Sequence, residues 1–452
     1  MNQTSSVDFL ILKENLLQMW LPVKGAQTVP EFCRLNWEKI AVYMFQMNII
    51  PFTFKNNRGE EFCKRQVFKT SFENYFDAQP PFQLGEAILS GSFSEGLFLY
   101  SSETPDMDVM CVLKNITFSE GDQEDGNLQL REDTPFVYAF VTNNETQHLW
   151  ACFFDEADKQ TGKYRLSSKK LKEKLGENYQ KTGRIFRSDC NEKIDEFSEG
   201  AAVTIRKIKP SNSISFFQSS SEIAKEVLRH PKHKRCKIKK ELSEQMRVDA
   251  LYKIIPSCDI VLSIYCEGWP LCALEWITRE RLWPDVSLVE EITQRGFHII
   301  PKSSADGDFR LSFSCAETML IKTLAPLQHK VMRAFKAVAK YSQNAWNPNL
   351  NEIITTYHLK TIAFWHFEKT SPESWIEDSL VHHLVTLLEE LAEALRIQSL
   401  PMYFMPMVNL LQDVDDPEVT INLMEKISSL SHNYSAMSEA VNNFKRNFFQ
   451  SL

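Results

Sequence analysis

Apolar positions follow two different periods along this chain, and the change between them suggests how it is organised. Short apolar or alternating runs predict strands at residues 109–113, 136–141, 149–154 and 257–264. Helical spacing recurs at residues 7–49, and again at 316–342, 350–367, 378–396 and 417–450. The pattern therefore predicts an α+β protein with its strands in the first two thirds and helices from about residue 287 onward.

Three parts follow from this pattern. Residues 1–55 are expected to form a helical spine packed on the core. Residues 56–286 carry the predicted strands and form the core, with a basic insert at 156–240. Residues 287–452 form a helical lobe.

One stretch, residues 84–113, combines a small-residue turn with paired acids. Gly91 and Ser92 lie in the turn, which is expected to open a helix and to offer N–H groups to an anion. Asp106 and Asp108 follow, and 13 residues separate Ser92 from Asp106. In a strand the two aspartates share one face and repel each other unless a cation lies between them. Oxygen ligands of this kind suit Mg²⁺ held together with substrate phosphates.

A further acid and two polar motifs lie later in the chain. Asp259 leads the apolar strand 257–264, where an unpaired carboxylate is costly to bury, so it is the expected third metal ligand. The run FRLSFSCAE at 309–317 enters a helix, and Ser314 with Glu317 has the spacing of a capping box. The run TTYHLKT spans 355–361.

Charge is distributed unevenly over the 452 residues. The whole chain has a net charge of −8, yet residues 156–240 hold 22 Lys and Arg against 11 Asp and Glu, a net of +11. This region is expected to bind a nucleic-acid duplex through its phosphates. The expected contacts are Lys169, Lys170, Lys172, Lys232, Lys234, Arg235, Lys237, Lys239 and Lys240.

Cysteine usage and the absence of targeting signals bear on location. The ten cysteines include no Cys-x-x-Cys pair, and several lie in apolar runs, which is typical of reduced thiols. No signal peptide and no transmembrane stretch is recognisable in the sequence. We expect a cytoplasmic protein with no membrane partner.

The ordered set of motifs resembles the cyclic GMP–AMP synthase-like receptors, which belong to the wider Mab nucleotidyltransferase family. The similarity rests on the Gly-Ser turn, the Asp-x-Asp pair, the distant third aspartate, the runs at 309–317 and 355–361, and Tyr403-Phe404 before Pro406. It implies a bilobed nucleotidyltransferase fold, with a mixed β-sheet core and a C-terminal helical bundle. It also implies that double-stranded nucleic acid activates the joining of two nucleoside triphosphates, such as ATP and GTP, into a cyclic dinucleotide for innate immune signalling.

The resemblance assigns roles by position. Gly91 and Ser92 would hold the triphosphate, while Asp106, Asp108 and Asp259 would bind two Mg²⁺ ions, or Mn²⁺. The nucleotide contacts implied on the helical side are Arg310, Glu317, Lys336, Thr356 and Tyr357, the last stacking on a base. The product would act through a STING-type receptor, and two copies of the chain would assemble on the nucleic acid.

Two departures from the family pattern refine these expectations. Asp106 stands where the animal synthase has Glu, and either is a competent ligand. Only 18 residues separate Glu317 from Lys336, and they include His329 but no Cys, so no structural zinc is expected. By analogy with relatives that lack zinc, the expected activator is double-stranded RNA rather than DNA. The protein would recognise this duplex by its shape and backbone. A catalytically silent scaffold, an enzyme that extends RNA ends, and activation by a metabolite remain open.

Overall fold

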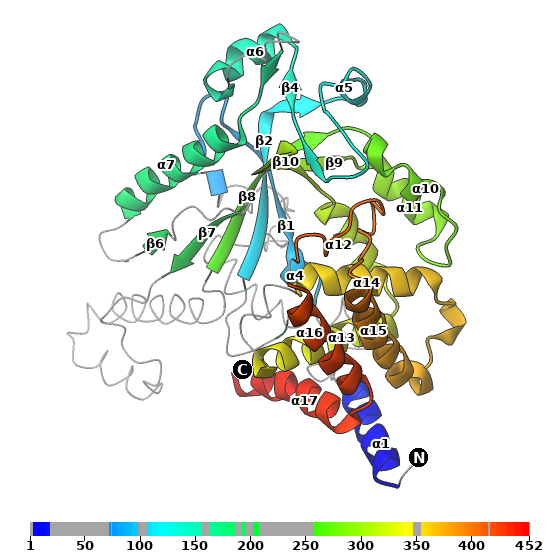
Figure 1. Cartoon of the computed structure of the whole chain (residues 1–452). Helices are drawn as coiled ribbons and strands as arrows, with labels where there is room; N and C mark the ends of the chain where they lie inside the picture. The colour runs from blue at the N-terminus through cyan, green and yellow to red at the C-terminus, as the bar shows by residue number, and fades with distance from the viewer. Residues whose placement is uncertain are drawn as a thin grey trace, which may run out of the picture.

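The computed structural model describes residues 3–18, 72–73, 75–97, 99, 106–155, 163–186, 192–194, 202–207, 257–346, 354–414 and 416–451. All structural statements below concern these residues. They form a mixed sheet surrounded by short helices and, toward the C-terminus, a group of longer helices (Figure 1).

The main sheet has the order β1-β2-β8-β9-β10-β3, with β7 beside β8 and β6 beside β7. Its strands are β1 (Leu84–Ser90), β2 (Asp106–Phe118), β3 (Phe136–Val137), β6 (Glu192–Ile194), β7 (Ala202–Lys207), β8 (Ser257–Cys266), β9 (Phe297–Ser304) and β10 (Gly307–Ser312). β2 and β8 run parallel, and the other pairs are antiparallel. The first half of β8 pairs with β7 and its last residues pair with β9, so two strands share one edge of β8.

β2 is buried over consecutive positions, because both faces of the sheet are covered there. Val109, Met110 and Cys111 are all buried, which is typical of a strand in a parallel pair. The segments around the sheet are α4 (Gly91–Ser94), α5 (Glu120–Glu124), α6 (Asn144–Trp150), η1 (Ala151–Phe153), α7 (Ser168–Phe186), η2 (Leu271–Ala273), α10 (Glu275–Thr278) and α11 (Val286–Gln294), together with the small sheet of β4 (Phe140–Val141) and β5 (Tyr164–Arg165).

The helical region consists of α1 (Gln3–Gln18), α12 (Ser314–Lys322), α13 (Pro326–Trp346), α14 (Thr356–Lys369), η4 (Pro372–Ser374), η5 (Glu377–Ser379), α15 (Leu380–Arg396), α16 (Pro417–Ser431) and α17 (Tyr434–Ser451). α15 packs on α16, and α1 packs on α17, α15 and α13, so the first and last helices lie side by side (Figure 1). The N-terminal spine expected at 1–55 therefore contacts the helical lobe over its described part, 3–18. Residues 19–55 lie outside the described chain.

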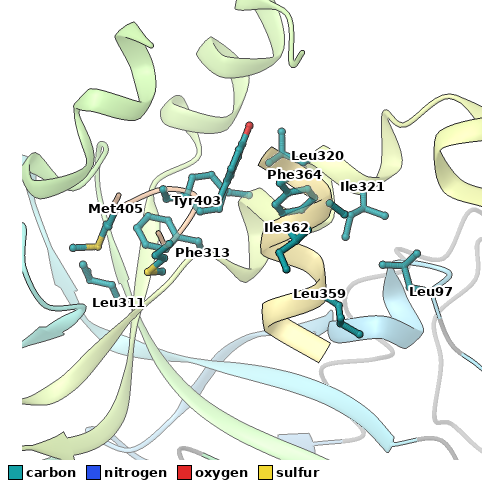
Figure 2. Close-up of a cluster of buried hydrophobic side chains, with 14 of the residues drawn as sticks. Leu97, Leu311, Phe313, Leu320, Ile321, Leu359, Ile362, Phe364, Tyr403 and Met405 are labelled. Carbon is teal, nitrogen blue, oxygen red and sulfur yellow. The ribbon is translucent and has the colours of Figure 1, made fainter. Parts of the chain in front are cut away.

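A continuous apolar core joins the sheet to the helices. Figure 2 shows side chains from β10, α12 and α14 meeting the loop that carries Tyr403 and Met405, with Leu97 at one side. Phe313 stacks on Phe404 with ring centroids 4.6 Å apart. Both rings also contact Trp269, which follows β8, so this packing holds the helices against the end of β8 opposite to Asp259.

The structure confirms the predicted α+β class, with a mixed sheet and a helical C-terminal region, but several elements differ from the sequence prediction. The strand predicted at 149–154 is the end of α6 followed by η1, because Asn143 caps a helix by accepting a hydrogen bond from the Thr146 N–H at 3.0 Å. Residues 287–313 supply most of α11 and strands β9 and β10, so the sheet extends beyond residue 286. The helix predicted at 316–342 is divided between α12 and α13, with Pro326 beginning the second helix.

Candidate active site

Gly91 lies directly beneath the carboxylate of Asp108. Gly91 begins α4 with φ +69°, a conformation that favours glycine. A Cβ built at this position would lie 1.9 Å from Asp108 Oδ2, so any side chain here would collide with the acid. β1 also places Ser90 opposite Asp108 on β2. The Gly-Ser turn and this predicted metal ligand are therefore neighbours.

The helix that follows the turn is only four residues long. It consists of Gly91–Ser94, so the site cannot rely on the dipole of a long helix. Any anion held here would be bound by local N–H groups and by the hydroxyl of Ser92. The helix predicted after the turn is thus present but much shorter than the pattern suggests.

Asp108 and Asp259 face each other across the parallel pair β2–β8. Strand register makes them direct partners, and residues paired in this way share a face of the sheet. Asp259 Oδ1 is buried and has no hydrogen-bond partner among the described residues. A buried acceptor without a donor, beside a second carboxylate, fits a hard divalent cation.

Asp106 is the first residue of β2 and pairs with Ser257 of β8, but its side chain lies outside the described part. Within that part, no three His, Cys, Asp or Glu side chains are gathered closely enough to hold a metal. The predicted three-acid site therefore has two acids in place and a third whose backbone lies one alternation away on the same strand.

A buried ionic triad joins the turn to the helical region. Lys360 Nζ on α14 donates to Glu95 Oε1 at 2.6 Å and to Glu317 Oε2 on α12 at 2.9 Å, and all three side chains are buried. Glu95 is four residues after Gly91, and its N–H donates to the Gly91 carbonyl at 3.1 Å. Burial opposes the charge on Lys360, but the two carboxylates hold its pKa above the usual range. Burial also raises the pKa of Glu95.

The triad corrects the role that the sequence suggests for Ser314 and Glu317. α12 begins at Ser314, its N-cap is Phe313, and no side chain caps it. Glu317 binds Lys360 instead of closing a capping box, because a buried ammonium without a carboxylate partner is costly. Ser314 Oγ lies 3.1 Å from Ser312 Oγ.

Lys336 and His329 approach the same turn from α13. Lys336 Nζ donates to the Leu97 carbonyl at 3.2 Å, and burial lowers its pKa to about 7, although Glu95 opposes this shift. His329 Nε2 lies 3.1 Å from the Glu95 carbonyl, and burial lowers the pKa of His329 to about 4. Because the pKa of Lys336 is about 7, its amine is suited to gain a proton when a phosphate binds beside it.

Arg310 and Tyr357 come together although 46 residues separate them in the numbering. The Arg310 Cζ lies 5.9 Å from the centre of the Tyr357 ring. Burial raises the pKa of Tyr357, and the nearby Glu317 adds to the effect. Thr356 begins α14 after Thr355, which forms a true capping box with His358. Sequence reasoning missed this cap because it looks for Glu or Gln at that position.

The predicted nucleic-acid residues are only partly described. On α7, Lys169 is 80% exposed and lies 3.9 Å from Glu173. Lys170 donates to the Phe154 carbonyl, and burial lowers the pKa of Lys172. The other predicted contacts, Lys232, Lys234, Arg235, Lys237, Lys239 and Lys240, lie outside the described residues. Of the three described lysines, Lys169 is the one best placed to meet a phosphate backbone.

Sequence reasoning also missed Glu95 and Lys360. Both lie inside motifs that it quoted or bordered, but a charged residue gives no sign of burial in the sequence alone. The only available signal is position, since Glu95 follows the Gly-Ser turn by one helical turn and Lys360 follows Tyr357 by three residues.

Comparison with known proteins identifies the domains of this chain. The sequence model of the Mab-21 protein nucleotidyltransferase domain matches residues 108–323, and that of the Mab-21 protein HhH/H2TH-like domain matches residues 327–429. The chain belongs to the Mab-21 nucleotidyltransferase family. The two matched regions meet at the connection between α12 and α13.

One curated relative is mab-21-like protein 3 of Danio rerio, which is 27% identical over 117 residues. The alignment covers 26% of this chain and 28% of that protein. Because the matched part is so small, the relative supports the family and no specific activity. Along the described chain, we find no helix with the length and apolar character that crossing a bilayer requires.

Proposed function

We propose that this Mab-21 family chain is a metal-dependent nucleotidyltransferase that joins two nucleoside triphosphates into a cyclic dinucleotide when it binds double-stranded RNA. One observation carries the proposal: Asp108 and Asp259 are paired across β2 and β8, directly above the Gly91 turn. A nucleotidyl transfer needs such a combination, because the triphosphate must be bound beside carboxylates that hold two divalent metal ions.

The donor set fits Mg²⁺, with Mn²⁺ as an alternative, held by Asp108 and Asp259 together with Asp106. When bound, two such ions would neutralise charge on the attacking and leaving oxygens of the transfer. Gly91 and Ser92 would bind the triphosphate. Asp259 would also accept the proton of the attacking sugar hydroxyl.

The helical side would position the nucleotides. The Tyr357 ring would stack on a base, with Arg310 beside the ring to meet phosphate or base edges. Thr356 would contact the nucleotide from the start of α14. Lys336 would meet a phosphate, since a ligand anion would restore the charge that burial weakens.

Activation would come from a duplex bound to the basic region 156–240. Its net charge of +11 in an otherwise acidic chain favours a phosphate backbone. The 18 residues between Glu317 and Lys336 contain no Cys, so no zinc module is expected there, which favours RNA over DNA. Two copies of the chain would assemble on one duplex in the cytoplasm, and the product would signal through a STING-type receptor.

The test uses the full-length chain with Mg²⁺ and labelled ATP, GTP, CTP and UTP, incubated alone, with long double-stranded RNA or with long double-stranded DNA. Mass analysis of the products should reveal a phosphatase-resistant dinucleotide in the RNA reaction only. Asp108→Asn and Asp259→Asn should each abolish it, while the matched control Asp306→Asn should not, since Asp306 binds Arg131 on the surface.

The alternatives predict different outcomes of the same experiment. An enzyme that extends RNA ends would lengthen the RNA and release no small product. A silent scaffold would yield no product and bind no nucleotide, whereas nucleotide binding without any product would indicate a different activator. Turnover that survives both Asn variants would refute the metal assignment.

A further inference from the structure

A cavity lies in the region where α10 and α11 meet the end of α14. Its volume is about 800 Å³, within the range usual for small-molecule sites. Two arginines, Arg279 and Arg281, line it, together with the buried carboxylate of Glu368 on α14. The cavity shares no lining residue with the proposed nucleotide site.

Arg279 is fully neutralised. Its guanidinium donates to Glu275 at 2.7–3.2 Å, to both oxygens of Glu368 at 3.3 Å and to the Tyr403 carbonyl at 2.9 Å. It also lies 4.2 Å from the centre of the Trp365 ring. Glu275 and Glu368 are thus already committed to this one arginine.

Arg281, two residues on, has no comparable partner among the described residues. Its Nε donates to the Arg279 carbonyl at 3.0 Å, and its Cζ lies 5.0 Å from the centre of the Trp276 ring. Its Nη1 and Nη2 are buried, and neither has a hydrogen-bond partner in the described part of the chain. A buried guanidinium whose Nη atoms make no hydrogen bond is costly, so the site calls for an acceptor that the described residues do not supply.

The mouth of the cavity is apolar. Leu282 and Val286, which line it, are 56% and 74% exposed, and Ile277 beside them is 36% exposed. Large apolar side chains left in water around a cavity mark a binding surface. A matching ligand would therefore place an oxyanion near Arg281 and an apolar group against this mouth.

We propose that the Arg281 cavity is a binding site for a small organic anion, one that carries a carboxylate or a phosphate on an apolar body. Such a ligand would turn the guanidinium of Arg281 toward the cavity and form the paired N–H···O bonds that its Nη atoms do not make with the described residues. The cavity does not overlap the proposed nucleotide site, so this proposal does not depend on the proposed nucleotidyl transfer. Glu280 and Glu290 lie exposed at the rim and would select against ligands with several negative charges.

Benzoate, phenyl phosphate, inorganic phosphate and benzyl alcohol are the probes, each titrated into the full-length chain and followed by saturation-transfer NMR. Benzoate or phenyl phosphate should bind at least tenfold more tightly than inorganic phosphate or benzyl alcohol. The tighter of the first two identifies the carboxylate or the phosphate as the preferred group. Arg281→Gln should weaken that binding at least tenfold, and Arg281→Lys should have an intermediate effect because it keeps the charge but loses the fork.

Arg295→Gln is the matched control, since Arg295 is an exposed α11 arginine paired with Glu291. It should bind the probes as the unaltered chain does. Arg281→Gln without ligand should melt at the same temperature or higher, because an unpaired buried charge is gone. Three results would overturn the proposal: no probe bound at millimolar concentration, equal binding after Arg281→Gln, or a lower melting temperature for that variant.

Discussion

Replacing Lys360 by Met should destabilise the chain strongly and in a pH-dependent way. Lys360 is the counter-charge for two buried carboxylates, Glu95 at 2.6 Å and Glu317 at 2.9 Å. Removing one partner of a buried ion pair costs about 3–5 kcal/mol, because an uncompensated charge remains. Methionine keeps much of the side-chain volume, so the charge is the main change.

Protonation limits this loss and sets its pH dependence. An orphaned carboxyl can take up a proton in the folded state, at a cost of about 1.4 kcal/mol for each pH unit above its unfolded pKa. With an ordinary Glu value of 4.5, this gives about 5 kcal/mol at pH 8 and about 1.4 kcal/mol at pH 5.5. The folded variant then binds more protons than the unfolded chain, so its stability falls as pH rises above 4.5.

The assay is urea unfolding followed by circular dichroism at pH 5.5 and pH 8. The variant should lose about 3–5 kcal/mol at pH 8 and markedly less at pH 5.5. Lys322→Met, at the exposed end of α12, is the control and should stay within about 0.5 kcal/mol. Adding Glu95→Gln to Lys360→Met should recover part of the loss. A loss below about 1 kcal/mol at pH 8, or the same loss at both pH values, would refute the reasoning.

Three further changes test the site. Gly91→Ala should abolish nucleotide binding, measured by calorimetry, because its Cβ would meet Asp108 at 1.9 Å; wild-type affinity would show that the turn does not bind phosphate. Nucleotide binding at pH 8 should take up close to one proton, because the pKa of Lys336 is about 7 when free and a phosphate raises it. Calorimetry in buffers of different ionisation enthalpy measures that uptake, and Lys336→Met should remove it. Tyr357→Ala should weaken nucleotide affinity by about 1–3 kcal/mol while Tyr357→Phe keeps it, and equal losses would exclude stacking.

The sequence predicts the chemistry of the site better than its surroundings. Asp108 and Asp259 each precede an apolar run, and this marks them as acids at the start of buried strands whatever the topology. Their pairing depends on the parallel register of β2 and β8, which joins segments about 150 residues apart and leaves no local trace. The sequence could therefore name the acids and assign them to one metal site, but it could not give the strand register that pairs Asp108 with Asp259.

Errors arose where tertiary contacts overrode a local signal. Residues 149–154 have strand-forming side chains, but the Asn143 cap and the burial of Trp150 hold the segment in a helical turn. Glu317 has the spacing of a capping residue, yet it serves Lys360. In both cases the local motif is present, but it stabilises the chain less than the burial of a large or charged side chain does.

The buried triad also bears on how the Gly91 turn and the helices α12 and α14 could move together. Glu95 belongs to the Gly91 turn, Glu317 to α12 and Lys360 to α14, so three segments share one ammonium. α14 also carries Tyr357, which places the proposed base-stacking ring one turn from that ammonium. A shift of α14 relative to the sheet would have to break short charged hydrogen bonds in a buried place. The turn and the ring should therefore keep a fixed spacing, and any activating movement should displace them as one body.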